Sequence, residues 1–159
     1  VPEVIAENGG LGVRSRVGHS YIKSLMAESG AIFGGEHSGH FYFADFWKAD
    51  SGMLAALYAI AELMATKSTL SELLQPFNRY VASGEINSKV KDAAKSIKFI
   101  RDKYHDGYEI DELDGLTVTA DSWWFNLRPS NTEPLLRLNV EANTEKEMVK
   151  IRDTVLSLI

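Results

Sequence analysis

The sequence has 159 residues, of which 45% are hydrophobic and 25% charged, and it contains no cysteine. This balance is typical of a globular protein with one domain or two small ones. Disulfides and thiolate zinc sites are excluded, no apolar run is long enough to predict a membrane span, and the net charge of −5 argues against a broad nucleic-acid surface. Because the N-terminus shows no signal-peptide pattern, we expect a cytoplasmic protein.

The first half of the chain alternates helical and strand patterns. Val4 and Ile5 before Gly9-Gly10 predict the end of a helix, so the chain is expected to begin inside a structural unit. The next expected elements are a short strand over residues 11–17, a helix over 19–29, a buried strand over 30–33, a strand over 41–43, a heavily buried helix over 51–66 and a helix opened by a capping box at 69–72. Strands separated by helices predict a parallel α/β sheet.

The second half has shorter elements with turn residues between them. We expect a strand near residues 80–86, a helix near 88–103, extended runs at 107–110, 116–120, 123–127 and 135–140, and a closing helix after a capping box at 144–147. Such closely spaced runs predict a sheet that is antiparallel at least in part. The change of pattern places the domain boundary near residues 77–84, which gives domains 1–79 and 80–159.

A polar loop at residues 34–40 joins two apolar runs and carries four polar side chains among three glycines. Glycines permit tight backbone paths and close approach of a ligand. Glu36 can accept hydrogen bonds from sugar hydroxyls, Ser38 can donate or accept, and His37 or His40 can move a proton near neutral pH. A hairpin with a polar tip is the structural alternative, and a metal site is disfavoured because the two histidines lack a matching third ligand.

A second polar loop, Arg128-Pro-Ser-Asn-Thr-Glu-Pro134, suits a phosphate dianion. Arginine offers a planar, permanently charged fork, and the Ser, Asn and Thr side chains with the turn amides add donors. The flanking prolines limit the freedom of the loop and so lower the entropy lost on binding. The alternative is an ordinary turn stabilised by its own side chains.

Three other features carry weaker signals. A cluster around Arg16 and His19 lies at the start of a predicted helix, where anions are attracted, although surface charges flanking a turn explain it nearly as well. Trp123 and Trp124 fit strand core better than sugar-stacking platforms. His105 is expected to be a solvated surface residue.

The order of these motifs resembles the α-D-phosphohexomutase family, specifically its bacterial phosphomannomutase/phosphoglucomutase branch. The resemblance rests on Val17-Gly-His19, Gly35-Glu-His-Ser-Gly-His40 and Arg128-Pro-Ser-Asn-Thr-Glu-Pro134, and it covers essentially the whole chain. It implies an α/β fold: the C-terminal portion of a three-layer α/β mutase domain three, followed by domain four, a small α+β unit with a mixed or antiparallel sheet that resembles TATA-binding protein.

The resemblance also implies an activity and residue roles. Family members interconvert hexose 1-phosphate and hexose 6-phosphate, of mannose or glucose, through a hexose 1,6-bisphosphate intermediate. Glu36, Ser38 and His19 would contact the sugar, and His40 would be a candidate general acid/base. The phosphate that is not transferred would bind Arg128, Ser130, Asn131 and Thr132.

The sequence lacks two motifs that the family needs for phosphoryl transfer. Neither the phosphoserine segment nor the aspartate-rich Mg²⁺ loop of the family occurs in it, so the Mg²⁺ ligands of the parent enzyme would lie outside this chain and no metal site is expected within it. We therefore expect a C-terminal mutase fragment that is inactive alone and whose partners are a phosphosugar and the N-terminal domains of the same polypeptide. The alternative is a stand-alone phosphosugar-binding or regulatory module. A third reading, a purely structural domain, would leave both polar loops without a function.

Overall fold

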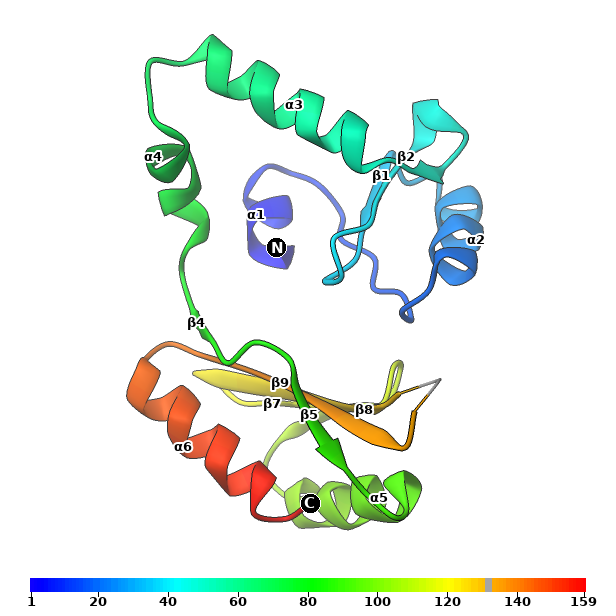
Figure 1. Cartoon of the computed structure of the whole chain (residues 1–159), viewed down its shortest axis with the longest axis vertical. Coiled ribbons are helices and arrows are strands. Elements are labelled where there is room, and N and C mark those ends of the chain that lie inside the picture. Colours follow the sequence, from blue (N-terminus) through cyan, green and yellow to red (C-terminus); the bar gives the residue numbers. More distant parts are fainter. Residues whose placement is uncertain (131–132) are drawn as a thin grey trace. The chain divides into compact units, whose positions relative to one another are not determined.

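The computed structural model describes residues 1–130 and 133–159, which form two compact units, Val1–Phe77 and Asn78–Ile159 (Figure 1). Among these residues no single helix has the length and apolar character to cross a membrane. The helices at Gly52–Ala65 and Leu70–Phe77 reach that composition only as a pair, and the chain bends by 108° between them.

The first unit is built around a small antiparallel sheet. Its elements are α1 (Pro2–Glu7), α2 (His19–Ser29), β1 (Phe33–Gly35), β2 (Phe41–Phe43), a 3-10 turn (Ala44–Phe46), β3 (Ala49–Asp50), α3 (Gly52–Ala65), α4 (Leu70–Leu74) and a second 3-10 turn (Gln75–Phe77). The strand order is β1-β2-β3, and the register pairs Phe33 with Phe43 and Gly35 with Phe41. The predicted helix over 19–29, the strand over 41–43 and the Thr69 capping box are confirmed.

Three predictions about the strands and sheet of this unit were wrong. Residues 11–17 form no strand, because their apolar and polar alternation has no neighbouring strand to pair with, and Leu11 is exposed. The strand expected over 30–33 begins only at Phe33, since Gly30 ends α2 in the left-handed conformation and Ile32 stays 82% exposed. The expected parallel sheet is antiparallel, because the loop between β1 and β2 is too short for the crossover that parallel strands require.

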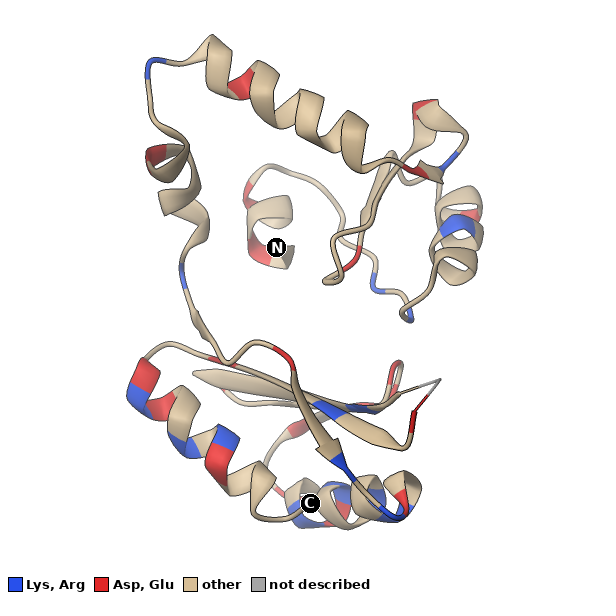
Figure 2. Cartoon of the chain, viewed as in Figure 1, with Lys and Arg blue, Asp and Glu red and all other residues tan. Residues whose placement is uncertain are grey.

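Helix α3 forms where it was predicted, with Ser51 capping its N-terminus through a 3.1 Å hydrogen bond from the Leu54 amide. Its predicted burial was wrong, because none of its residues is buried and Met53 and Met64 are about four-fifths exposed. Figure 2 shows this helix almost without charge. An apolar groove of about 800 Å³ lies between α3 and the hairpin of β1 and β2, and it is lined by Phe33, Phe43, Tyr58 and their neighbours. The small sheet therefore covers only part of the apolar surface of α3.

The second unit is an antiparallel sheet with two helices. Its elements are β4 (Val81–Ala82), β5 (Ile86–Lys89), α5 (Ala93–Tyr104), β6 (Glu109–Asp111), β7 (Leu116–Thr119), β8 (Trp123–Pro129), β9 (Leu135–Ala142) and α6 (Glu145–Leu156). The strand order is β4-β9-β8-β7-β6, and β5 also pairs with β9. The predicted antiparallel sheet is confirmed, because every pair in it is antiparallel.

Several boundaries in this unit differ from the prediction, most clearly those of its first strand and first helix. The strand expected at 80–86 is divided into β4 and β5, and helix α5 begins at Ala93 because Asp92 caps it with a 3.0 Å hydrogen bond from the Lys95 amide. The capping box predicted at Thr144 forms only in part. Thr144 accepts from the Glu147 amide, while the Glu147 carboxylate accepts a 2.6 Å hydrogen bond from Ser122.

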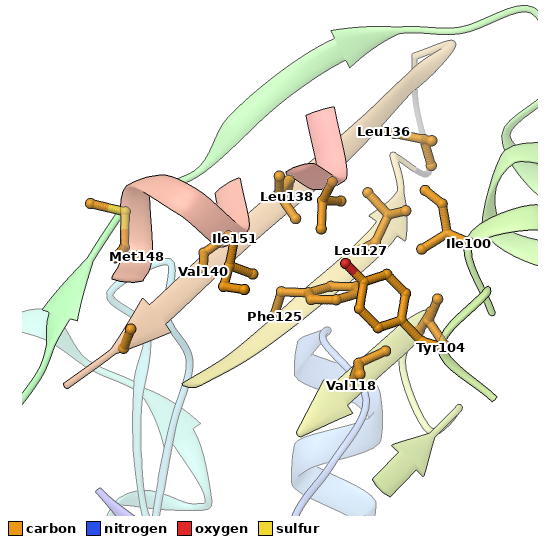
Figure 3. Packing of buried hydrophobic residues seen from close by; sticks show 13 residues of the cluster. Ile100, Tyr104, Val118, Phe125, Leu127, Leu136, Leu138, Val140, Met148 and Ile151 are labelled. Carbon is orange, nitrogen blue, oxygen red and sulfur yellow. The ribbon is translucent and has the colours of Figure 1, made fainter. Parts of the chain in front are cut away.

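Strict alternation along β8 and β9 gives the sheet one apolar and one polar face. Phe125, Leu127, Leu138 and Val140 point into the core, which α5 and α6 complete (Figure 3). The intervening residues are half-buried on the opposite face, and all but one of them are polar: Trp124, Asn126 and Arg128 on β8, and Arg137, Asn139 and Glu141 on β9. The same packing that buries the core therefore sets the positions of both arginines.

Candidate functional site

The Glu36 carboxylate is held in place by groups from two other elements. Its Oε2 accepts from the Gly18 amide at 3.1 Å, and its Oε1 accepts from the Tyr42 hydroxyl at 2.5 Å. Burial, and then the hydrogen bond to Glu36, raises the pKa of Tyr42, so this hydroxyl stays protonated and keeps donating. A carboxylate has about four acceptor positions, so Glu36 retains capacity for hydroxyl donors from a ligand.

Close packing of α2 against the hairpin brings the segment at Gly18 and His19 beside Glu36. A Cβ on Gly34 would lie 3.0 Å from Ile22 Cγ2 and 3.1 Å from Met26 Sδ, so only glycine lets the helix approach this strand without a shift. His19 is the first residue of α2 and is exposed. The structure thus joins two motifs that are separated in the sequence.

The hairpin loop is closed by backbone hydrogen bonds at its base. The Glu36 amide donates to the His40 carbonyl at 2.9 Å, and the Gly39 amide donates to the Glu36 carbonyl at 3.0 Å, with Gly39 at a positive φ of 84°. Ser38 and His37 are exposed at the tip. The loop therefore presents Ser38 to solvent from a closed turn.

His40 is paired with Asp50, which sequence reasoning missed. The His40 Nδ1 lies 2.6 Å from Asp50 Oδ2, while Asp50 Oδ1 accepts from the Phe41 amide at 2.8 Å. This hydrogen bond and the charge of Asp50 raise the pKa of His40, and the same contact lowers the pKa of Asp50. Because Nδ1 is engaged by the carboxylate, Nε2 is the ring nitrogen left to exchange a proton with a ligand.

Arg128 lies beside a second arginine in the β8–β9 ladder. The register places Arg128 opposite Arg137, and Glu85 contacts both, with Arg128 Nη2 to Oε2 at 3.2 Å and Arg137 Nη1 to Oε1 at 3.5 Å. Neither Arg137 nor Glu85 was predicted from the sequence. For Arg137 the available signal was the alternation along its strand, which puts Arg137 on the face opposite to the apolar residues.

Ser130 lies at the end of this ladder, next to both arginine-bearing strands. Its amide donates to the Leu135 carbonyl at 2.8 Å, and its Oγ accepts from Arg137 Nη2 at 3.4 Å and from the Glu133 amide at 3.3 Å. Asn131 and Thr132, the other two predicted phosphate ligands, lie outside the described residues. The described part of the loop therefore joins Ser130 to the arginine pair.

The remaining sequence candidates take structural positions. Trp123 packs against the core as expected and stacks on Phe125. The core position expected for Trp124 was wrong, because strand alternation places it on the opposite face, where its Nε1 donates to Glu141 at 3.2 Å. His105 is largely exposed and lies 3.2 Å from Asp106. Within residues 1–130 and 133–159 no three His, Asp or Glu side chains are grouped so as to hold a metal ion.

Comparison with known proteins assigns each half of the chain to a described domain. Residues 1–80 match the family description "Phosphoglucomutase/phosphomannomutase, alpha/beta/alpha domain III", and residues 85–158 match "Phosphoglucomutase/phosphomannomutase, C-terminal domain". The resemblance identified from the motifs is therefore confirmed, and so is the expected combination of an α/β mutase domain with a small, mainly antiparallel domain.

Individual relatives agree with this assignment. A phosphomannomutase of Methanocaldococcus jannaschii is 45% identical over the whole chain, and one of Escherichia coli is 42% identical over 99% of it. A solved phosphoglucomutase/phosphomannomutase family protein of Burkholderia thailandensis matches with a TM-score of 0.82 at 30% identity, over 98% of this chain and 34% of that one. The chain spans about a third (35%) of the length of the two sequence relatives.

Proposed function

The chain belongs to the phosphoglucomutase/phosphomannomutase family, and we propose that its two polar loops recognise a hexose phosphate within a phosphohexomutase. The whole enzyme would interconvert hexose 1-phosphate and hexose 6-phosphate through a hexose 1,6-bisphosphate. The observation that carries the proposal is the pair of half-buried arginines, Arg128 and Arg137, on neighbouring strands beside Ser130. Two adjacent guanidinium groups offer planar, charge-assisted donors that match a phosphate dianion.

The hairpin loop at residues 34–40 would bind the hydroxyl groups of the sugar. Glu36 is already fixed by Gly18 and Tyr42, so its remaining acceptor positions meet hydroxyl groups with little further loss of side-chain entropy. Ser38 adds a hydroxyl that donates or accepts, and His19 lies beside Gly18 at the start of α2. Hydroxyl contacts of this kind suit a ligand that must bind in two orientations, because every ring hydroxyl offers both a donor and an acceptor.

His40 would move the proton that accompanies phosphoryl transfer to or from a sugar hydroxyl. In its neutral form Nε2 accepts the hydroxyl proton, and in its protonated form the same nitrogen returns it. Asp50 orients the ring through Nδ1 and stabilises the protonated form. This role predicts that His40→Ala lowers kcat more than it raises KM.

The phosphate that is not transferred would bind to Arg128 and Arg137, together with Ser130, Asn131 and Thr132. Replacement of Arg128 by alanine in the full-length protein should cost about 1.5–3 kcal/mol of binding to mannose 6-phosphate, the scale of a hydrogen bond to a charged group. The matched control is Arg152→Ala, which removes the same charge from an exposed ion pair with Asp153 on α6. Equal calorimetric affinities for the two variants would remove the phosphate-binding assignment.

Phosphoryl transfer itself would depend on parts of the enzyme other than these residues. The family resemblance implies Mg²⁺, but the described residues offer no group of ligands for it. We propose that the 159 residues alone do not turn over hexose 1-phosphate. Measurable mutase activity of this segment by itself would contradict that proposal.

A second function, phosphosugar binding without catalysis, would use the same two loops. The two functions differ in the polypeptide that carries them, because a mutase needs a phosphoserine and an aspartate-rich metal loop. Mass spectrometry of the full-length protein for a phosphorylated serine, together with a mutase assay, separates them. Phosphosugar binding without phosphoserine or turnover would favour the binding module.

A further inference from the structure

We propose that Glu85 is a positioning residue of the phosphate site: its carboxylate bridges Arg128 and Arg137, so that both guanidinium groups are held ready for one phosphate. The inference deepens the proposed function and rests on phosphate binding by Arg128. It assigns to Glu85 an effect on ligand affinity that acts through the arginines and involves no contact between Glu85 and the ligand.

The ladder between β8 and β9 creates the need for such a residue. Arg128 and Arg137 are directly opposite each other in the register, and like charges in directly opposed positions repel and destabilise a sheet. Their side chains are only 19% and 28% exposed, so water screens the repulsion less than it would at an open surface. Without a counter-charge the two guanidinium groups are expected to turn away from each other.

Glu85 supplies that counter-charge with a geometry that serves both arginines. One carboxylate oxygen, Oε2, lies 3.2 Å from Arg128 Nη2, and the other, Oε1, lies 3.5 Å from Arg137 Nη1. Because each oxygen faces a different arginine, the carboxylate fixes the separation of the two groups. Glu85 itself is 28% exposed, which places the bridge in a partly desolvated position.

The backbone around Glu85 is anchored on both sides to the strand that carries Arg137. Before Glu85, the Ser83 amide donates to the Val140 carbonyl at 2.9 Å and the Ser83 Oγ accepts from the Val140 amide at 3.0 Å. After it, Ile86 pairs with Leu138 of β9. Gly84, at a positive φ of 68°, makes the turn between the two attachments. The backbone on both sides of Glu85 is therefore fixed to β9, and this places the carboxylate next to the two arginines.

The bridge leaves donors of both arginines available for an anion. A guanidinium group has five N–H donors, and Glu85 contacts one terminal nitrogen of each arginine. Arg137 Nη2 reaches Ser130 at 3.4 Å, and Arg137 Nε is buried without a hydrogen-bond partner among the described residues. The three side chains together keep a charge of +1, so the site still attracts a phosphate dianion.

Positioning and simple electrostatics predict opposite results when Glu85 is neutralised. A negative charge beside an anion site repels the ligand, so its removal should tighten phosphate binding if charge alone mattered. If Glu85 orders the arginines, its removal should weaken binding, because the ligand must then restrain two long side chains that repel each other. The sign of the change therefore decides between the two.

The test measures calorimetric binding of inorganic phosphate and of mannose 6-phosphate to the full-length protein and its Glu85→Gln variant. We expect about 10-fold weaker binding by Glu85→Gln, the effect of one lost charge-assisted contact, and a KM for the sugar phosphate that rises more than kcat falls. Asp153→Asn is the matched control, because it makes the same charge change on α6, on the other face of the sheet. Glu85→Asp keeps the carboxylate and should bind better than Glu85→Gln, and it carries the test if Glu85→Gln does not fold.

A second readout reports on the arginines without any ligand. In ¹H–¹⁵N spectra recorded at low temperature, the Nη–H signals of Arg128 and Arg137 should be resolved in the unaltered protein, because the contacts to Glu85 restrain both guanidinium groups. In Glu85→Gln these signals should broaden and move toward exposed-arginine values. Unchanged signals would overturn the positioning role. Unaltered protein that binds phosphate, with Glu85→Gln equal or tighter, overturns this inference alone, whereas unaltered protein that binds no phosphate overturns the proposed function as well.

Discussion

Substitution of Gly115 by alanine tests how closely the sheet is packed around Arg128. Gly115 has a φ of +75°, and a Cβ there would lie 2.5 Å from the Leu127 carbonyl oxygen and 2.7 Å from Arg128 Cβ. The left-handed conformation costs about 1–2 kcal/mol for a residue with a Cβ, and the overlap with backbone adds about 1–3 kcal/mol because strand β8 must shift. We therefore expect Gly115→Ala to lower the free energy of unfolding by about 2–5 kcal/mol.

Denaturant unfolding followed by circular dichroism measures this loss, and Gly107→Ala is the matched control. Gly107 also has a positive φ, +92°, but an added Cβ there meets nothing within 4 Å, so only the conformational cost of about 1–2 kcal/mol applies. Since the overlap occurs at Arg128, Gly115→Ala should also weaken phosphate binding, while Gly107→Ala should not. Losses of stability that agree within about 0.5 kcal/mol, a typical limit for surface substitutions, would refute the argument from close approach.

Three further predictions concern the hairpin loop, a helix terminus and the core. In Asp50→Asn the pKa of His40 should fall from its raised value toward the ordinary 6.5, as followed by NMR of the ring protons; a pKa that stays raised would contradict the assigned cause. The stabilising effect of the pair is fully present below that ordinary histidine pKa and is lost as the pH rises through the raised one. On the acid side it is lost as the pH falls through the lowered pKa of Asp50. Thr69→Ala removes the capping box of α4 and should cost about 1 kcal/mol in thermal unfolding, with Thr69→Ser close to the unaltered protein. Trp123→Ala, at a partly buried core position, should cost up to about 3 kcal/mol and leave phosphosugar affinity unchanged, so a specific loss of affinity would point to a binding role instead.

Periodicity predicted the elements of the second unit because its sheet is buried on one face only. The alternation along β9, with Leu136, Leu138 and Val140 inward and Arg137 and Asn139 outward, is visible in the sequence and is realised in the structure. In the first unit the apolar residues of α3 suggested burial, but they remain largely exposed because the three-stranded sheet is too small to cover them. Apolar sequence therefore predicted the helix correctly and its environment incorrectly.

The candidate site was predictable only where its residues are close together in the chain. Glu36, Ser38 and His40 share one loop and could be grouped from the sequence. Asp50 lies ten residues after His40, and its contact with His40 depends on the pairing of β2 with β3. Strands this short have no sequence pattern from which their pairing could be predicted. Glu85 reaches Arg128 across 43 positions, and such a contact follows from strand order, which periodicity does not reveal.

In each polar loop, the side chain that we propose to bind the ligand is held by contacts within its own unit. The Glu36 carboxylate is held by Gly18 and Tyr42, and the Arg128 guanidinium is held by Glu85. Immobilising a flexible side chain on binding costs about 0.5–1.5 kcal/mol, so each held side chain spares a ligand that binds to it about that amount. Within each unit the partner comes from a different element, so folding of that unit alone is enough to hold the side chain in place. Removal of a holding residue should then weaken the binding of a hexose phosphate even though that residue never touches it, and it should do so in either unit.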